Sequence, residues 1–298
     1  MNHSTPVGVH PEEALNHALL VRGLNEHGIY TRVVDGIRIH AITCGWVKYR
    51  NAHVHSILGP YFVLLDPTWD DWMPIYSWVI EHPEGTIVID TGETARSSRP
   101  EHIKGGGMNG WLNQHLARIN VNETSDLLAQ LNLLGIHPDT VRWVILTHLH
   151  LDHAGGLGYF PKAEILVAHK EFVRPYAFVE SIYPSWFDPH LIGHFDDVGG
   201  PFESGHVLTK AGDVVIVPTP GHTPYHQSVI FKTSQADFFF AGDACFTYSQ
   251  IVSGFVPGIN ADRHVARQTL EKIKQYCRER PTICLPSHDL KSTQRFFN

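Results

Sequence analysis

Four side chains of the kinds that bind metal ions lie within six residues of one another, in the segment THLHLDHAGG at residues 147–156. The segment directly follows a predicted apolar strand, and loops at strand ends present functional groups from a rigid scaffold. In an extended turn His148 and His150 point the same way, and Asp152 and His153 follow as the chain turns into a helix. We therefore expect one metal ion at the first two histidines and a neighbouring ion at Asp152 and His153, because imidazole and carboxylate suit zinc and similar metals. A helix start with incidental histidines would explain an isolated His-x-His better than it explains this group.

Three later segments share one layout, in which an apolar strand ends in a potential metal ligand. The strand at 214–219 leads to His222, the strand at 238–241 leads to Asp243, and the strand at 282–286 leads to His288. A single histidine at a strand end is more often a hydrogen-bonded structural residue. Four such segments in order are hard to attribute to chance, so the placement of these residues, more than the total of 22 histidines, indicates a metal centre.

The chain as a whole predicts one α/β domain that follows an N-terminal arm. Residues 11–27 have the pattern of an amphipathic helix, so 1–35 are expected to form an arm, packed on the core or in a homodimer contact, and 36–298 to form the domain. Antiparallel strands followed by helix–strand alternation are typical of sheets flanked by helices. The glycine-rich segment 103–111 is too irregular for either element, and 175–208 is expected to be a loop on the substrate side. The predicted strands are 37–46, 61–65, 76–81, 86–90, 141–147, 164–168, 213–218, 226–232, 237–242 and 282–286, and the further helices are about 124–135 and 261–278.

Composition argues against several classes of partner. The formal net charge is −7 and the basic residues form no runs, whereas nucleic acid or an anionic membrane would need a concentrated basic patch. A small, weakly charged substrate fits better. The four cysteines lack a zinc-ribbon spacing and are expected to be free thiols in a reducing compartment. With no apolar core of a signal peptide and no run of the ~20 residues that span a bilayer, the expected location is cytoplasmic.

The order His-x-His-x-Asp-His, then His, Asp and His, with TPGHT and GD around the middle pair, resembles the metallo-β-lactamase superfamily over about residues 37–290. The resemblance implies an αββα sandwich with metal ions at the edge between two sheets. Zinc is the expected metal, with iron, cobalt and manganese as alternatives. Asp90 in the segment IDTG matches an early aspartate of the family, which orients a ligand histidine or shapes the backbone under the metals. The implied ligands are His148, His150 and His222 for one divalent ion and Asp152, His153 and His288 for the other, with Asp243 as the bridge.

Within the superfamily, the segments HLDHAGG, TPGHTPYHQS and GDACFT are most similar to the quorum-quenching N-acyl homoserine lactonases. This resemblance implies that a hydroxide shared by two metal ions opens a lactone ring, and that Asp152 binds metal and also shuttles the proton. These enzymes commonly have a tyrosine three residues after the bridging aspartate, in contact with the substrate carbonyl, where this chain has Phe246. Either Tyr248 or another donor replaces it, or the metals polarise the carbonyl alone. Tyr248 as an ordinary core residue is equally open.

Aromatic residues in the first third of the chain suggest a pocket for an acyl chain. Met108 and Trp111, in the glycine-rich segment, are the residues expected to touch substrate there. The alternative for them is ordinary packing.

Other functions of the superfamily fit less well. A glyoxalase II-type thioesterase would have a C-terminal helical region, but only ten residues follow His288. A β-lactamase tends to have cysteine in place of Asp243, and a nuclease would need a basic surface. A broad esterase or phosphotriesterase and a redox enzyme with iron stay open. A non-catalytic scaffold would be expected to have lost ligands, and all seven are present.

Overall fold

The computed structural model describes residues 27–56, 63–98 and 106–297, and over these ranges the strands form two sheets. The first has the order β1-β2-β3-β4-β6-β7-β8, with β5 also paired to β2, and the second has the order β14-β13-β12-β11-β10-β9. The strands are β1 (Ile29–Val34), β2 (Ile37–Tyr49), β3 (Met73–His82), β4 (Gly85–Ile89), β5 (Ala117–Asn120), β6 (Val141–Ile145), β7 (Glu164–Ala168), β8 (His190–Ile192), β9 (Asp196–Asp197), β10 (Ser204–Val207), β11 (Val214–Pro218), β12 (Gln227–Phe231), β13 (Asp237–Gly242) and β14 (Thr282–Pro286).

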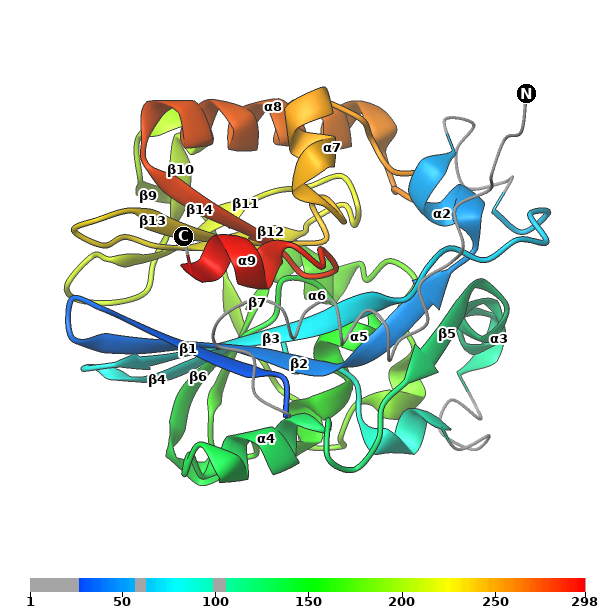
Figure 1. Ribbon diagram of the computed structural model, residues 1–298, viewed down its shortest axis with the longest axis horizontal. Helices are drawn as coiled ribbons and strands as arrows, with labels where there is room; N and C mark the ends of the chain where they lie inside the picture. Colours follow the sequence, from blue (N-terminus) through cyan, green and yellow to red (C-terminus); the bar gives the residue numbers. More distant parts are fainter. Residues whose placement is uncertain (1–26, 57–62, 99–105, 298) are drawn as a thin grey trace.

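Helices cover the outer faces of the two sheets, so the molecule is the predicted αββα sandwich. Figure 1 shows α7 and α8 above the second sheet and α4 below the first. The helices are α2 (Asn51–His55), α3 (Gly107–Leu116), α4 (Leu127–Leu133), α5 (Leu151–Ala154), α6 (His169–Val173), α7 (Tyr248–Ser253), α8 (Arg263–Glu279) and α9 (Ser292–Phe297).

The alternation of side chains along each strand divides the core into layers. In β6, Ile145 packs between the two sheets with Trp78 and Phe240, whereas its neighbour Val144 packs on the other face with Leu131 of α4. This follows from the two-residue period of a strand. Because β4, β6 and β7 run parallel and are covered on both faces, their sequences are almost continuously apolar.

The long helix α8 covers the outer face of the second sheet, and the ends of the helix follow from its local sequence. Asp262 is the N-cap, and its carboxylate accepts hydrogen bonds from the backbone N–H groups of His264 and Val265. The buried side chains Ala266, Leu270 and Ile273 recur at helical spacing and pack on that sheet. The helix ends before Pro281, as expected of a residue that disfavours helix in the position before it.

Several predicted boundaries are corrected by the structure. The glycine-rich segment was expected to be irregular, but α3 begins at Gly107, and residues 111–116, which contain no glycine or proline, continue the helix. Residues 63–65 form a turn where a strand was predicted. Residues 29–34, assigned to the arm, pair with β2 in the first sheet. The segment 175–208, expected to be a loop, contains β8, β9 and β10. The predicted helix 11–27 lies outside the described residues except at its last residue.

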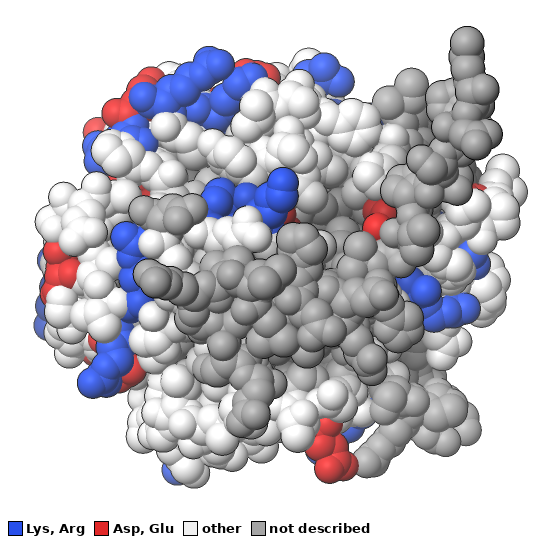
Figure 2. Space-filling view, viewed as in Figure 1, with Lys and Arg blue, Asp and Glu red and all other residues white. Residues whose placement is uncertain are grey.

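The remaining expectations concern cysteines and surface charge. All four cysteines are unpaired, and Cys44, Cys245 and Cys284 are buried. Within the described ranges, no helix combines the length and apolarity needed to cross a membrane. On the face shown in Figure 2, the described Lys and Arg side chains lie in separate groups, with acidic side chains beside several of them.

Candidate metal centre

Seven predicted ligands meet at one end of the sandwich because each follows the carboxyl end of a strand. His148 and His150 follow β6 of the first sheet, and Asp152 and His153 lie in the short helix α5 after them. The other three follow strands of the second sheet: His222 after β11, Asp243 after β13 and His288 after β14. The cluster therefore bridges the edge between the two sheets.

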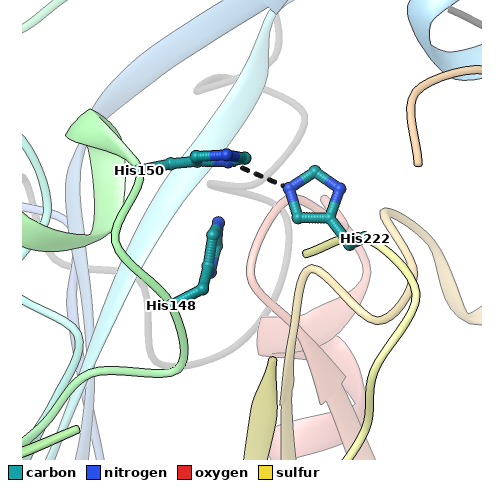
Figure 3. A group of neighbouring side chains, drawn as sticks. All are labelled: His148, His150 and His222. Atoms are coloured by element: carbon teal, nitrogen blue, oxygen red, sulfur yellow. Dashed lines mark hydrogen bonds between the residues drawn. The ribbon is translucent and has the colours of Figure 1, made fainter. Parts of the chain in front are cut away.

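His148, His150 and His222 form the first group, drawn in Figure 3. One ring nitrogen of each lies within 4.8 Å of the others. The Nδ1 atom of His150 and the Nε2 atom of His222 are 3.0 Å apart. Three imidazoles from two sheets thus converge on one point.

Asp152, His153 and His288 form a second group with ligand atoms within 4.8 Å, and Asp243 lies between the two groups. Asp243 Oδ2 is 3.4 Å from His222 Nε2 in the first group. Asp243 Oδ1 is 3.3 Å from His153 Nε2 and 3.2 Å from His288 Nε2 in the second. One carboxylate therefore turns one oxygen toward each group.

Buried polar atoms in this cluster have no hydrogen-bond partner among the described residues. They are the Nε2 atoms of four histidines and one carboxylate oxygen, namely those of His148, His150, His153 and His288 and Oδ1 of Asp243. Buried polar atoms are almost always satisfied in native proteins, and nitrogen and carboxylate oxygen are ligands that divalent transition metals accept. The residues present therefore fit a divalent metal centre.

The charges within the cluster are strongly coupled. Burial and the neighbouring histidines hold the pKa of His148 well below its usual value. Burial also opposes protonation of His288, but the carboxylates of Asp243 and Asp152 outweigh it and raise its pKa to about 10. A cation bound here would replace these protons, so metal binding is coupled to proton release.

Asp90, to which the resemblance assigned a role in orienting a ligand histidine or shaping the backbone, contacts the ligand loop. Its Oδ1 accepts a hydrogen bond from the backbone N–H of Thr147 at 2.8 Å, and its Oδ2 accepts one from the Thr147 hydroxyl at 2.9 Å. The same Oδ2 is 2.8 Å from His153 Nδ1. A proton on Nδ1 leaves Nε2 of His153 as the lone-pair donor that faces the cluster. Asp90 has a φ of 55°, which aspartate tolerates better than most residues.

His226 was not predicted as a site residue, although it lies in the segment TPGHTPYHQS. Its Nε2 accepts a hydrogen bond from the backbone N–H of Asp243 at 3.0 Å, and its Nδ1 is 2.8 Å from the Thr219 hydroxyl. Gly242 makes this approach possible: its φ is 55°, and a Cβ there would lie 2.7 Å from His226 Nε2. His226 thus positions Asp243, and both of its ring nitrogens are engaged in hydrogen bonds outside the ligand set.

A cavity of about 370 Å³ opens onto the cluster, and His150, Asp152, His222 and Asp243 form part of its lining. Tyr49 and His53 also line it and were missed in the sequence, because nothing in their local spacing marks them. The other lining residues come from α3, the start of β5, the segment after α6 and two loops: Asn109, Leu112, Asn113, Leu116, Ala117, Tyr176, Ala177, Leu64 and Ile259.

Of the four predicted substrate contacts, one lies at the site and three lie elsewhere. Met108 and Trp111 lie on α3 but on its outer face, 70% and 49% exposed, and the same helix lines the cavity with other residues. Phe246 is buried beside the cluster, with its ring centroid 5.8 Å from that of His222. Tyr248 instead packs against Arg295, whose guanidinium carbon lies 5.0 Å from the centroid of the tyrosine ring, and both residues line a different cavity. The structure therefore brings Phe246 to the site but not Met108, Trp111 or Tyr248.

Glu171 of α6 is buried against Thr223, the residue that follows His222. The Thr223 hydroxyl donates a hydrogen bond of 2.9 Å to Oε2 of Glu171. Burial raises its pKa to about 7 from 4.5, against the opposing effect of the Thr223 hydrogen bond. The folded protein thus binds this proton more tightly than the unfolded chain does. As pH rises above about 4.5, the free energy of unfolding therefore falls, and this loss is complete above about pH 7. In denaturant unfolding, the free energy of unfolding of Glu171→Gln should exceed that of the native protein by a margin that grows by about 2 kcal/mol between about pH 5.5 and 8.5. A difference independent of pH would contradict this assignment.

The chain is similar to a known protein family and to several known proteins. Residues 70–288 match the family model of the metallo-beta-lactamase superfamily. The chain is 26% identical to the N-acyl homoserine lactonase AiiA of Bacillus thuringiensis subsp. kurstaki, over 85% of this chain and 94% of the relative. It is 26% identical to the N-acyl homoserine lactonase AttM of Rhizobium radiobacter, over 73% of this chain and 82% of the relative.

Solved structures show the same fold. An N-acyl homoserine lactone hydrolase with N-hexanoyl-L-homoserine bound at its catalytic metal centre has a TM-score of 0.70 at 21% identity, over 86% of this chain and 94% of that one. The dizinc lactonase AidC has a TM-score of 0.60 at 16% identity, over 88% and 90%. Because the family model spans most of the chain, including all seven predicted ligands, the chain belongs to the metallo-beta-lactamase superfamily and is one of its metal-dependent hydrolases.

Proposed function

We propose that this enzyme opens the lactone ring of N-acyl homoserine lactones, or of a closely related lactone, at a centre of two divalent metal ions. The observation that carries the proposal is the position of Asp243, whose two oxygens face two separate groups of ligands. His148, His150 and His222 would hold one ion, Asp152, His153 and His288 the other, and Asp243 would bridge them. Zinc suits this donor set of imidazole and carboxylate.

Two ions held by these residues would supply a hydroxide at neutral pH and polarise a carbonyl oxygen. The side chains of this enzyme hold and orient the reactants. Asp152 has a carboxylate inside the cluster and at the cavity wall, which suits it to receive the proton of the attacking water and pass it to the leaving alkoxide. No serine or cysteine nucleophile is required by this arrangement.

The cavity fits the size and polarity of an acyl lactone. Leu64, Leu112, Leu116 and Ile259 provide apolar lining for an acyl chain, and His150, Asp152, His222 and Asp243 provide polar lining at the cluster. This division is typical of small-molecule sites, in which a few polar groups fix orientation and apolar surface provides affinity. The curated relatives, named as N-acyl homoserine lactonases, support the same substrate class.

A substrate panel tests the proposal. Metal-loaded enzyme should open N-acyl homoserine lactones and release one proton for each ring opened at neutral pH, because the product carboxylic acid ionises. Aryl esters, phosphotriesters and thioesters, measured in parallel, should be poorer substrates by kcat/KM. If lactones of several acyl lengths release no acid while aryl esters do, the enzyme is a general esterase and the lactonase proposal fails.

Removal of the metal ions should also destabilise the fold. Chelation leaves the buried nitrogen and oxygen atoms of the cluster without partners, and a ligand that binds only the folded state stabilises it by mass action. We expect the unfolding temperature to fall by about 10 °C after chelation and to recover when zinc is restored. An unfolding temperature unchanged by complete chelation would contradict a metal centre at this position.

A further inference from the structure

The Tyr49 hydroxyl lies beside the predicted metal ligands but is not one of them. Tyr49 ends β2 and is buried, and its hydroxyl donates a hydrogen bond of 2.6 Å to Oδ2 of Asp152. The same oxygen lies 3.3 Å from Nε2 of His288. Because Tyr49 also lines the cavity, its hydroxyl lies at the boundary between the ligand cluster and the space open to substrate.

Aromatic packing fixes the position of this hydroxyl. The Tyr49 ring stacks on His53 with a centroid distance of 4.2 Å and an interplanar angle of 17°. It also stacks on Phe246 at 5.9 Å and 22°, and Phe246 in turn packs 5.6 Å from the ring of His288. A ring held in this way loses little further freedom when its hydroxyl binds a ligand. Phe246 itself has no polar atom to offer.

His53 is a second unexplained polar group in the same wall. It belongs to α2, lines the cavity and is only 8% exposed. Its Nδ1 has no hydrogen-bond partner among the described residues. Burial lowers its pKa to about 3, so the ring is neutral and offers one donor and one acceptor nitrogen. A buried nitrogen of this kind needs a partner, and a molecule bound in the cavity can supply it.

We propose that Tyr49 and His53 form the substrate-orienting pair of this cavity, in which the Tyr49 hydroxyl donates to the carbonyl oxygen of the scissile ester and His53 binds the neighbouring amide of an N-acyl lactone. The proposal rests on the proposed function, since it names the groups that recognise that substrate. The Tyr49 hydroxyl exchanges one acceptor, Asp152, for another, and no proton is transferred. A donor at this oxygen stabilises most in the transition state, where negative charge develops on it.

A purely structural role makes a different prediction. If Tyr49 only held Asp152 in place, its loss would weaken metal binding, and substrates of every kind would suffer through the metal. If Tyr49 contacts substrate, its loss leaves the metal content intact and changes binding of the ring-opened product. Metal content and product binding therefore separate the two roles without relying on turnover.

The first experiment compares Tyr49→Phe with Tyr276→Phe. Tyr276 is a matched control, because its buried hydroxyl also donates to an aspartate, Oδ2 of Asp237, at 2.6 Å, but it does not line the cavity. For Tyr49→Phe we expect kcat/KM to fall about 100-fold on acyl lactones. Calorimetry should show product binding about 10-fold weaker, with two metal ions per chain as in the native enzyme. Tyr276→Phe should keep native kinetics and product affinity.

The second experiment tests His53 with two substrates. His53→Phe keeps an aromatic ring against Tyr49 but removes both ring nitrogens. We expect KM for N-hexanoyl homoserine lactone to rise about 10-fold, and the effect on γ-butyrolactone, which has no amide, to be several-fold smaller. Tyr49→Phe should impair both substrates, because both have the ester carbonyl.

The outcomes distinguish this proposal from the function on which it rests. Native kinetics and product affinity in Tyr49→Phe, or loss of metal from that variant, would overturn the role of Tyr49 in substrate binding. Equal effects of His53→Phe on both lactones, or no effect on either, would overturn the role of His53. In each of these cases the native enzyme still opens lactones, whereas a metal-loaded native enzyme with no activity on any lactone would overturn the proposed function and this pair together.

Discussion

Asp243→Ala is expected to lower kcat/KM for lactone opening by about 1,000-fold and to leave the protein unable to hold two metal ions. Asp243 is 3% exposed, and its two oxygens are the carboxylate atoms that face both ligand groups. Without them, His222 faces a gap on one side, and His153 and His288 lose a carboxylate 3.3 and 3.2 Å away on the other. The measurements are metal content by mass spectrometry and steady-state kinetics.

Asp237→Ala is the matched control for this variant. Asp237 is also a buried aspartate, but it begins β13, whereas Asp243 follows the end of that strand. Asp237→Ala should lose stability, because the Tyr276 hydroxyl loses its acceptor, yet keep its metal content and activity. Native metal content and kinetics in Asp243→Ala would contradict the bridging role.

The second large effect is expected at Asp90, which contacts no substrate. In Asp90→Asn, the amide nitrogen would face the Thr147 hydroxyl and the Nδ1 of His153, so at least one buried donor would lose its acceptor. We expect metal affinity to fall about 10- to 100-fold and the free energy of unfolding to fall by about 3 kcal/mol. Competition with a chromophoric chelator measures the first, and denaturant unfolding measures the second.

Asp35→Asn controls for the unusual backbone at Asp90. Asp35 also has a positive φ, 52°, but it lies in the exposed turn between β1 and β2, far in the sequence from any ligand. Its substitution should leave metal affinity unchanged. If Asp90→Asn behaved like Asp35→Asn, the hydrogen bonds that Asp90 accepts would have no role in orienting the ligand loop.

The sequence is informative about the cluster because each candidate ligand closely follows a predicted strand. His222, Asp243 and His288 each lie within four residues of a strand end, and strand ends are what a two-sheet sandwich brings together at one edge. Asp90 also follows a strand, β4, but it was identified through the resemblance of the segment IDTG to the superfamily. The structure adds the direction in which each ring nitrogen points, and the division of Asp243 between the two groups depends on that direction.

The cavity walls were harder to predict because they depend on contacts distant in sequence. Tyr49 meets Asp152 across 103 positions, and its strand pattern gives no reason to separate it from other buried tyrosines. Met108 and Trp111 were chosen from the correct segment, but with the segment taken as irregular, the helical face that meets the cavity was not defined. Tyr248 was near Phe246 in sequence, yet α7 begins there and turns it toward Arg295.

A titration of metal-free enzyme with zinc tests the central claim most directly. Lactone opening, followed by acid release, should rise with added zinc and reach its maximum at two equivalents per chain, the number required by two ligand groups that share Asp243. Full activity at one equivalent, activity that needs no metal, or a protein that purifies with a single iron ion and opens no lactone would contradict the two-metal hydrolase described above.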